Sequence, residues 1–422
     1  MATIESVTYS PSQPEITQNG LEWKKCEGDR AFLLPMIFWE NGEPWREANI
    51  WLKEQAKDDL CDIKTVNSKA YSLLTYAKWL EVSKVSWLSF PEAKDERCLN
   101  RYRGALISLR SANKLAPSTT TNKMRVAIQL YRWLLEKDII PKDLSLWVDR
   151  SITIRFNTAR GTSLSKTVRS SSLSIPCRRI NKANPEDGLW PLTPEDREKV
   201  LDCAEAYSTT EVFLMLLLGF HTGLRIESIA DLRTQTLQRA IPHPLSENFH
   251  IIHVGPGASP PVKTKYDITG QIEIPTRLLR LLADYVNSSE HTRRREKATP
   301  ADKNIVFLTI RGNQYARRDL NSSPAINVAM YQLRQIGIDR KIEVLGRFKF
   351  HQTRATFATE LILHAVTYDP ENCLNIVSNS LLQRDEQSAL AYIKFVKREH
   401  KQVASNAANK FTQAFLGRFY ED

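Results

Sequence analysis

The chain has 422 residues, of which 42% are hydrophobic and 25% are charged, as is ordinary for globular proteins with a sizeable core. These proportions exclude a disordered tail, a collagen-like fibre and a small disulfide-stapled scaffold. At about 150 residues per domain, two to three domains are expected. The 59 Lys and Arg residues outnumber the 48 Asp and Glu residues, giving a net charge of +11. Such an excess makes nucleic acid the first partner to consider.

Cysteine spacing and hydropathy argue against a metal site, a membrane span and secretion. No two of the six cysteines have the C-x-x-C spacing of a zinc or redox site, so we expect reduced structural thiols. The longest uncharged apolar run, Val212–Phe220, is far shorter than the ~20 residues that cross a bilayer. The first residues include Glu5 and no apolar core, so we expect a soluble, cytoplasmic protein without a signal peptide.

The N-terminal 44 residues are predicted to form an arm. The first 20 are rich in Ser, Thr, Pro, Gln and Asn, which favours a flexible segment. The apolar stretch Ala31–Trp39 that follows is expected to be either a strand or a docking segment.

Residues 45–150 are predicted to form a small helical domain without strands. Thr65 is the expected N-cap of a helix whose apolar positions from Val66 to Leu80 form one stripe. A second helix is expected to follow Pro117 and the Ser/Thr run after it. A third, Leu99–Leu109, is expected between these two.

Residues 151–189 are predicted to be a basic linker between domains. No Asp or Glu occurs between Arg150 and Asn184. A solvated tether would need no such bias, so we expect the segment to follow a phosphate backbone. The candidate DNA-binding residues are Arg155, Arg160, Lys166, Arg169, Arg178 and Arg179.

A second domain is predicted over residues 190–422. Thr193 is the expected N-cap of its first helix, with Pro194 at the first helical position. Two strands, Phe249–Val254 and Gln271–Pro275, are expected after helices that reach about residue 240. The Arg293–Arg295 run is expected in a polar surface loop. Further helices are predicted at about 276–288, 321–337, 352–366, 371–382 and 386–412.

No serine-hydrolase, zinc-protease or Walker signature occurs in the chain, but the second domain carries four other elements in order. Arg225 follows a glycine that ends a buried helix, and Lys263 lies in the turn between the two predicted strands, with Lys265 as its competitor. His351 and Arg354 are one turn apart at a helix start. Tyr392 lies in a late helix.

In this order, T-G-L-R, K-T, H-x-x-R and a late tyrosine resemble the tyrosine recombinase (phage-integrase type) family over about residues 190–400. The helical segment before them is similar to that family's core-binding domain. The resemblance implies a mainly helical α+β fold with a small β-sheet. A SAM-like core-binding domain would precede the tyrosine recombinase catalytic domain.

The resemblance also implies a site-specific recombinase, an integrase or transposase of a mobile element, that needs neither ATP nor metal. Arg225 and Arg354 would bind the non-bridging phosphate oxygens, because guanidinium groups are bidentate and always charged. Tyr392 would attack to form a 3′-phosphotyrosine bond, with His351 relaying its proton. Lys263 would protonate the departing 5′ oxygen.

Two positions depart from the family pattern. Relatives carry an acidic residue three positions after the first arginine, where this chain has Ser228, with Glu227 one place earlier. Nine residues before Tyr392, where relatives carry His or Trp, the chain has Gln383, followed by Arg384. Glutamine can donate a neutral hydrogen bond to a phosphate oxygen but supplies no charge, which favours reduced or regulated activity.

The implied partner is double-stranded DNA at a specific recombination site, in the nucleoid of a bacterial host. The family's behaviour implies two protomers on one site and four in synapsis. A last helix with Phe411, Phe415 and Leu416 would either dock on a neighbouring protomer or belong to the protein's own core. A type IB topoisomerase and a DNA-binding relative without catalysis are the alternatives.

Overall fold

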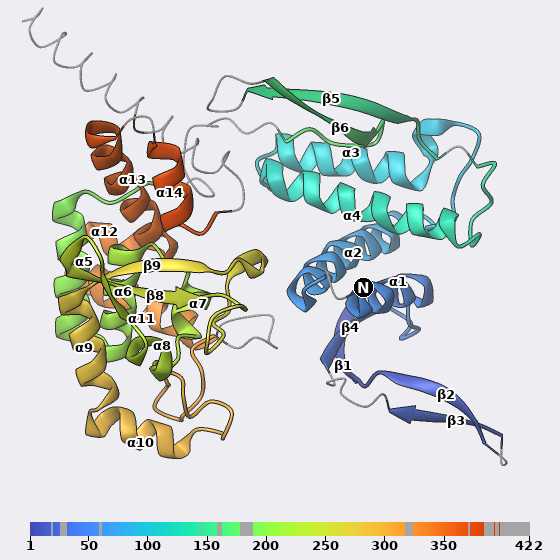
Figure 1. Ribbon diagram of the computed structural model, residues 1–422. Coiled ribbons are helices and arrows are strands. Elements are labelled where there is room, and N and C mark those ends of the chain that lie inside the picture. Colours follow the sequence, from blue (N-terminus) through green and yellow to red (C-terminus); the bar gives the residue numbers. More distant parts are fainter. Residues whose placement is uncertain are drawn as a thin grey trace, which may run out of the picture. The chain divides into compact units, whose positions relative to one another are not determined.

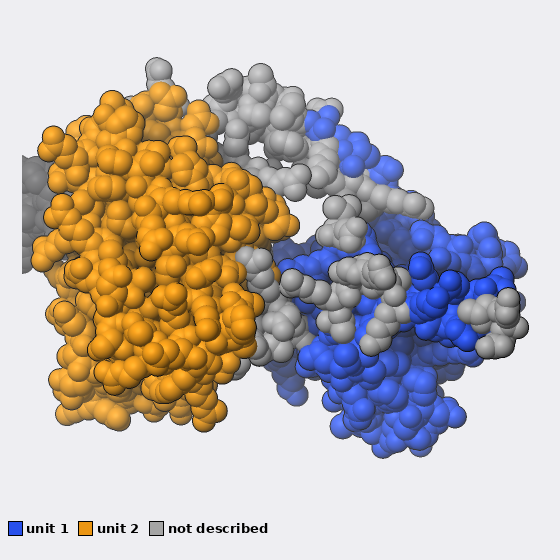
Figure 2. Space-filling view, turned by 60° about the horizontal axis from the view of Figure 1, so that its bottom comes forward, with its two compact units in different colours: residues 1–180, 319–321 blue, residues 181–318, 322–422 orange. Residues whose placement is uncertain are grey.

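The computed structural model describes residues 1–17, 20–25, 32–58, 61–144, 146–157, 163–177, 189–316, 324–369, 372–383, 392 and 396. The chain divides into two compact units, residues 1–180 with 319–321, and residues 181–318 with 322–422 (Figure 2). Helices dominate, with small antiparallel sheets (Figure 1), which confirms the mainly helical α+β fold. Among the described helices, none is long and apolar enough to span a membrane.

The first unit contains four main helices around an aromatic core. They are α1 (Arg46–Lys57), α2 (Ile63–Ser83), α3 (Cys98–Ser111) and α4 (Pro117–Glu136), with a 3₁₀ turn at Lys94–Glu96. Tyr76 and Tyr131 are buried and their hydroxyls lie 2.9 Å apart. Helix α2 begins earlier than predicted. Its cap is Asp62, whose side chain accepts a hydrogen bond from the Lys64 amide, because Asp caps a helix as well as Thr does.

The flexible-arm prediction for the N-terminus is wrong. Strand β1 (Thr3–Tyr9) pairs antiparallel with β4 (Phe32–Phe38), and β2 (Ser12–Thr17) pairs with β3 (Gly20–Lys25). Ala2 and Ile37 are fully buried against the helical core. The composition of the first 20 residues does not reveal this strand, because its hydrogen-bonding partner lies more than twenty residues further along the chain. The strand alternative for Ala31–Trp39 is confirmed.

Part of the predicted linker forms a β-hairpin. Strands β5 (Asp149–Asn157) and β6 (Ser163–Ser171) pair antiparallel, with Thr153 opposite Thr167. Helix α3 holds the chain after the hairpin, because Arg103 Nε donates to the Leu173 carbonyl at 3.2 Å. Three candidate DNA-binding residues lie on the strands, namely Arg155, Lys166 and Arg169. Arg160, Arg178 and Arg179 lie outside the described residues.

The second unit is built around a buried helix and a three-stranded antiparallel sheet of order β7-β8-β9. The strands are β7 (Ile241–His243), β8 (Ser246–Val254) and β9 (Gly270–Pro275). The described helices are α5 (Pro194–Tyr207), α6 (Thr210–Thr222), α7 (Ile226–Ala230), α8 (Thr234–Gln238), α9 (Thr276–Val286), α10 (Ser289–Lys297), α11 (Pro324–Asp339), α12 (Glu343–Arg347), α13 (His351–Tyr368) and α14 (Cys373–Ser380).

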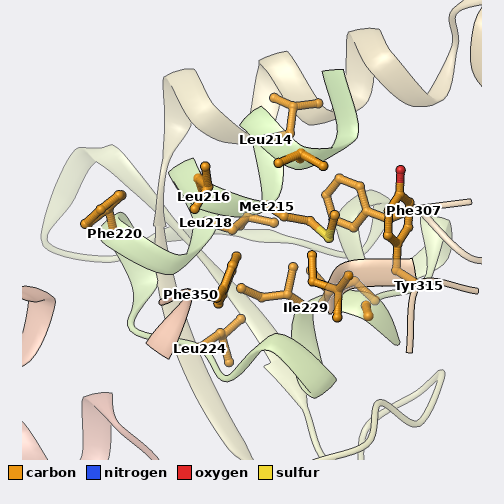
Figure 3. Close-up of a cluster of buried hydrophobic side chains, with 14 of the residues drawn as sticks. Leu214, Met215, Leu216, Leu218, Phe220, Leu224, Ile229, Phe307, Tyr315 and Phe350 are labelled. Carbon is orange, nitrogen blue, oxygen red and sulfur yellow. The ribbon is translucent and has the colours of Figure 1, made fainter. Parts of the chain in front are cut away.

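Helix α6 is the centre of this unit's core. Its apolar side chains from Leu214 to Phe220 lie in one cluster with Ile229, Phe307 and Phe350 (Figure 3). The predicted cap of α5 is confirmed, since Thr193 Oγ1 accepts from the Asp196 amide at 3.1 Å. The helix predicted at 386–412 lies outside the described residues apart from Tyr392 and Val396. The docking residues Phe411, Phe415 and Leu416 also lie outside them.

The loop predicted for Arg293–Arg295 is a helix, and the predicted surface exposure is confirmed for Arg293 and Arg295 but not for Arg294. These residues belong to α10, and Arg294 is 5% exposed. Its guanidinium lies 2.9 Å from the buried carboxylate of Glu211, and it donates to the Leu308 carbonyl at 2.8 Å. The Tyr285 hydroxyl donates to Glu211 at 2.6 Å, and burial with this carboxylate raises the pKa of Tyr285. The sequence hides this because Glu211, the partner of Arg294, lies in the first turn of α6, far from Arg294 along the chain.

Candidate functional site

The first candidate arginine follows the end of helix α6. Gly223 has a φ of +64° and its amide donates to the Gly219 carbonyl at 3.1 Å, which terminates the helix. Arg225, two residues on, is the half-buried N-cap residue of α7. The predicted glycine-terminated buried helix before Arg225 is thus confirmed.

The second candidate arginine joins two helix ends that are far apart in the sequence. Arg354 lies one turn after His351, the first residue of α13, and is 2% exposed. Its Nη1 donates to the Gly223 carbonyl at 2.7 Å and its Nη2 to the Leu381 carbonyl at 2.8 Å. Both acceptors belong to C-cap residues, of α6 and α14. Helix C-termini carry partial negative charge, so this position suits a buried cation.

Two glycines set how closely α6 approaches α13. A Cβ atom at Gly219 would lie 2.5 Å from Thr353 Oγ1, and one at Gly223 would lie 2.4 Å from a ring carbon of Phe357. Real side chains do not tolerate such distances, so only glycine fits at either place. This close packing brings the Gly223 carbonyl within reach of Arg354.

Asp231, which none of the sequence motifs singles out, holds the loop that carries Lys263. The loop joins β8 to β9, and the Lys263 amide donates to Asp231 Oδ2 at 2.6 Å. The Lys263 side chain is half-buried. Lys265 is exposed, with its ammonium 5.2 Å from the centre of the Tyr266 ring. The signal available in the sequence is an acidic residue six positions after Arg225, flanked by Ile229, Ala230 and Leu232.

Gln383 lies three residues after the end of α14, and its main-chain amide donates to the Ser378 carbonyl at 3.0 Å. The side-chain nitrogen and oxygen are both buried and have no hydrogen-bond partner among the described residues. Just before it, Leu382 touches the start of β9, because a Cβ at Gly270 would lie 2.4 Å from Leu382 Cδ2. The end of the Lys263 loop therefore meets the segment that leads to Gln383. Arg384 lies outside the described residues.

Tyr392 is fully buried in an apolar cluster between α13 and α14, two helices that lie side by side in Figure 1. The cluster includes Ala355, the neighbour of Arg354, and Leu381, whose carbonyl Arg354 binds. The tyrosine ring thus belongs to the same packing unit as the Arg354 contacts.

The structure brings together segments that hold five of the six candidate catalytic residues. Arg354 contacts the turn before Arg225 and the segment before Gln383, with Tyr392 in the adjoining cluster and His351 one turn away on α13. The loop of Lys263 is joined to the end of α7. The basic residues on β5 and β6 belong to the other unit.

Ser228, the position at which the chain departs from the family's acidic residue, is 3% exposed within α7. Among the described residues, no three or more His, Cys, Asp or Glu side chains gather as a metal-binding group.

No protein-family model matches the chain, and no curated protein matches it in sequence. Solved structures of the Tn1549 transposon integrase are similar in fold. One complex with a circular intermediate DNA has a TM-score of 0.52 at 12% identity, covering 84% of this chain and 99% of that chain. Another has a TM-score of 0.50 at 14% identity, covering 82% and 94%. At such identities the likeness concerns the fold.

Proposed function

We propose that this chain, which has the fold of the tyrosine recombinases, is a site-specific DNA recombinase that acts through Tyr392. The observation that carries the proposal is the pair of hydrogen bonds from Arg354 to Gly223 and Leu381. These bonds join, around one buried cation, the T-G-L-R turn, the helix that begins with H-x-x-R and the segment that leads to Gln383. A mere surface arginine needs no such arrangement.

The chemistry follows from the side chains gathered there. The guanidinium groups of Arg225 and Arg354 bind the non-bridging oxygens of the scissile phosphate, where charge builds up in the transition state. The Tyr392 oxygen forms a bond to phosphorus while the bond from phosphorus to the 5′ oxygen breaks. His351 accepts the phenolic proton and Lys263 gives a proton to the 5′ oxygen. The resulting 3′-phosphotyrosine keeps the bond energy, so rejoining needs neither ATP nor metal.

The buried amide of Gln383 fits the same scheme. A buried polar group without a partner costs about 1–3 kcal/mol, and the described residues offer this side chain none. A phosphate oxygen bound between the two arginines would accept a hydrogen bond from it. The cost of leaving the side-chain nitrogen unpaired would then disappear when DNA binds.

Full burial of Tyr392 means that a phosphate reaches the phenolic oxygen only after the residues around it rearrange. We propose that DNA binding at the recombination site, with two protomers on one site and four in synapsis, drives this rearrangement. The same burial favours a second candidate function, that of a DNA-binding relative without catalysis. The two differ in whether a covalent bond to DNA ever forms.

A nicked suicide substrate tests the proposal, because loss of the short 5′ fragment traps the covalent product. Denaturing gels should show a protein–DNA adduct with the natural chain and none with Tyr392→Phe. Tyr368→Phe is the matched control, since Tyr368 is 83% exposed at the end of α13, and it should leave the adduct unchanged. Tight binding with no adduct from the natural chain would support the non-catalytic function. Relaxation of supercoils without strand exchange would indicate a topoisomerase.

A further inference from the structure

We infer that Asp231 is a positioning residue that holds Lys263 where it can protonate the departing 5′ oxygen. The inference rests on the proposed function and adds a residue to it. Asp231 is 2% exposed. Its Oδ2 accepts from the Lys263 amide at 2.6 Å, and its Oδ1 accepts from Arg233 Nη2 at 3.2 Å.

The bond matters because Lys263 lies in a long connection. Residues 255–269 join β8 to β9, and connections of about 15 residues readily sample several conformations. Internal bonds shape this one, among them Thr264 Oγ1 to the Ile268 carbonyl at 2.7 Å. Arg239 ties the loop to the unit's body at Ser259. Asp231 ties it at Lys263 itself, with a charge-assisted bond, which is stronger than a neutral one.

Asp231 is itself held in place. The Leu232 carbonyl next to it accepts from the Val306 amide at 2.9 Å, and Thr234 donates to the Asn304 carbonyl at 2.8 Å. On its other side, Asp231 ends the short helix α7, which Arg225 begins. One five-residue helix therefore fixes the proton donor relative to an arginine that binds the phosphate.

Such a link affects one step more than others. A general acid must lie within about 2.6–3.2 Å of the atom it protonates, and a 1 Å displacement can cost about 100-fold in rate. Without Asp231 the loop can shift Lys263 while both arginines keep their supports. DNA binding would persist and the departure of the 5′ oxygen would slow.

A substrate whose departing 5′ oxygen is replaced by sulfur isolates that step, because a thiolate leaves without being protonated. On the ordinary suicide substrate, Asp231→Ala should cleave about 100-fold more slowly, with unchanged DNA affinity. On the sulfur substrate the loss should nearly vanish, as it should for Lys263→Ala. Asp231→Asn keeps an acceptor for the Lys263 amide and should fall between. Asp267→Asn, an exposed acid in the same loop, should behave like the natural chain.

Equal losses of Asp231→Ala and Asp231→Asn on both substrates would overturn the inference, because they would show a general structural role. No loss on either substrate would overturn it as well. If the natural chain forms no adduct with either substrate, the proposed function itself fails. That outcome can be distinguished from the two outcomes that overturn only the role of Asp231.

Discussion

Arg354 has a structural role that its proposed chemical role would share. Its two terminal nitrogens bind main-chain carbonyls of residues 223 and 381, and a guanidinium has five N–H donors in all. A lysine carries the same charge, but its single ammonium cannot span two carbonyls in a fixed plane. Under the proposed function, the residue that binds the phosphate would therefore also be the residue that holds the helix ends together.

Substitution of Gln383 should affect stability and activity differently. Replacing Gln383 with Leu removes a buried amide that lacks partners among the described residues, so the free energy of unfolding without DNA should stay the same or rise by about 1 kcal/mol. Cleavage should fall at least about tenfold, the equivalent of one hydrogen bond to the phosphate. Denaturant unfolding and single-turnover cleavage measure the two effects. Cleavage at the natural rate would show that the amide does not contact the reacting phosphate.

At the scale of elements, the contact between α6 and α13 should be intolerant of a single methyl group. Gly223→Ala puts a Cβ 2.4 Å from Phe357 at a φ of +64°, and overpacking of this kind costs about 1–3 kcal/mol. Gly104→Ala is the control: Gly104 lies inside α3 with nothing near its missing Cβ, so the change should stabilise by about 0.5–1 kcal/mol. The account would be contradicted if denaturant unfolding showed that both substitutions change the free energy of unfolding in the same direction.

The arginines of α10 should differ in how much they contribute to stability, because Arg294 is buried and Arg293 is exposed. Arg294→Ala leaves the Glu211 carboxylate buried without its ion-pair partner, and breaking a buried pair in this way costs about 3–5 kcal/mol. Arg293 is exposed on the same helix, so Arg293→Ala should change the free energy of unfolding by less than about 0.5 kcal/mol. Equal effects of the two substitutions, measured by denaturant unfolding, would refute the structural role assigned to Arg294.

These elements also show what the sequence could reveal. The Thr193 cap and the glycine end before Arg225 were predictable because each depends on a few neighbouring residues. Strand β1 is not predictable from its own residues, because its partner β4 is distant in the sequence. The burial of Arg294 is not predictable for the same reason, because its partner Glu211 is distant in the sequence. The order of the motifs indicated which residues to examine, whereas the contacts of Arg354 and Asp231 required the fold.

At the scale of the whole molecule, the basic segment between the predicted domains either binds the DNA backbone or only connects the two domains. Arg155 and Arg169 lie on the β5–β6 hairpin of the first unit. That this segment follows the DNA backbone is a prediction from its charge. Replacing Arg155, Arg160, Arg169 and Arg178 with Ala should weaken binding to all DNA sequences. The slope of log K against log salt should flatten by about 0.9 for each lost phosphate contact. An unchanged slope would make the segment a tether.

Identifying the tyrosine that bonds to DNA tests the central claim most directly. After trapping, nuclease digestion and trypsin cleavage, mass spectrometry should find the nucleotide remnant on the peptide of residues 385–394, which contains Tyr392. The peptide of residues 355–384 contains the exposed Tyr368 and should be unmodified. A remnant on that peptide, or on any tyrosine other than Tyr392, would contradict the account.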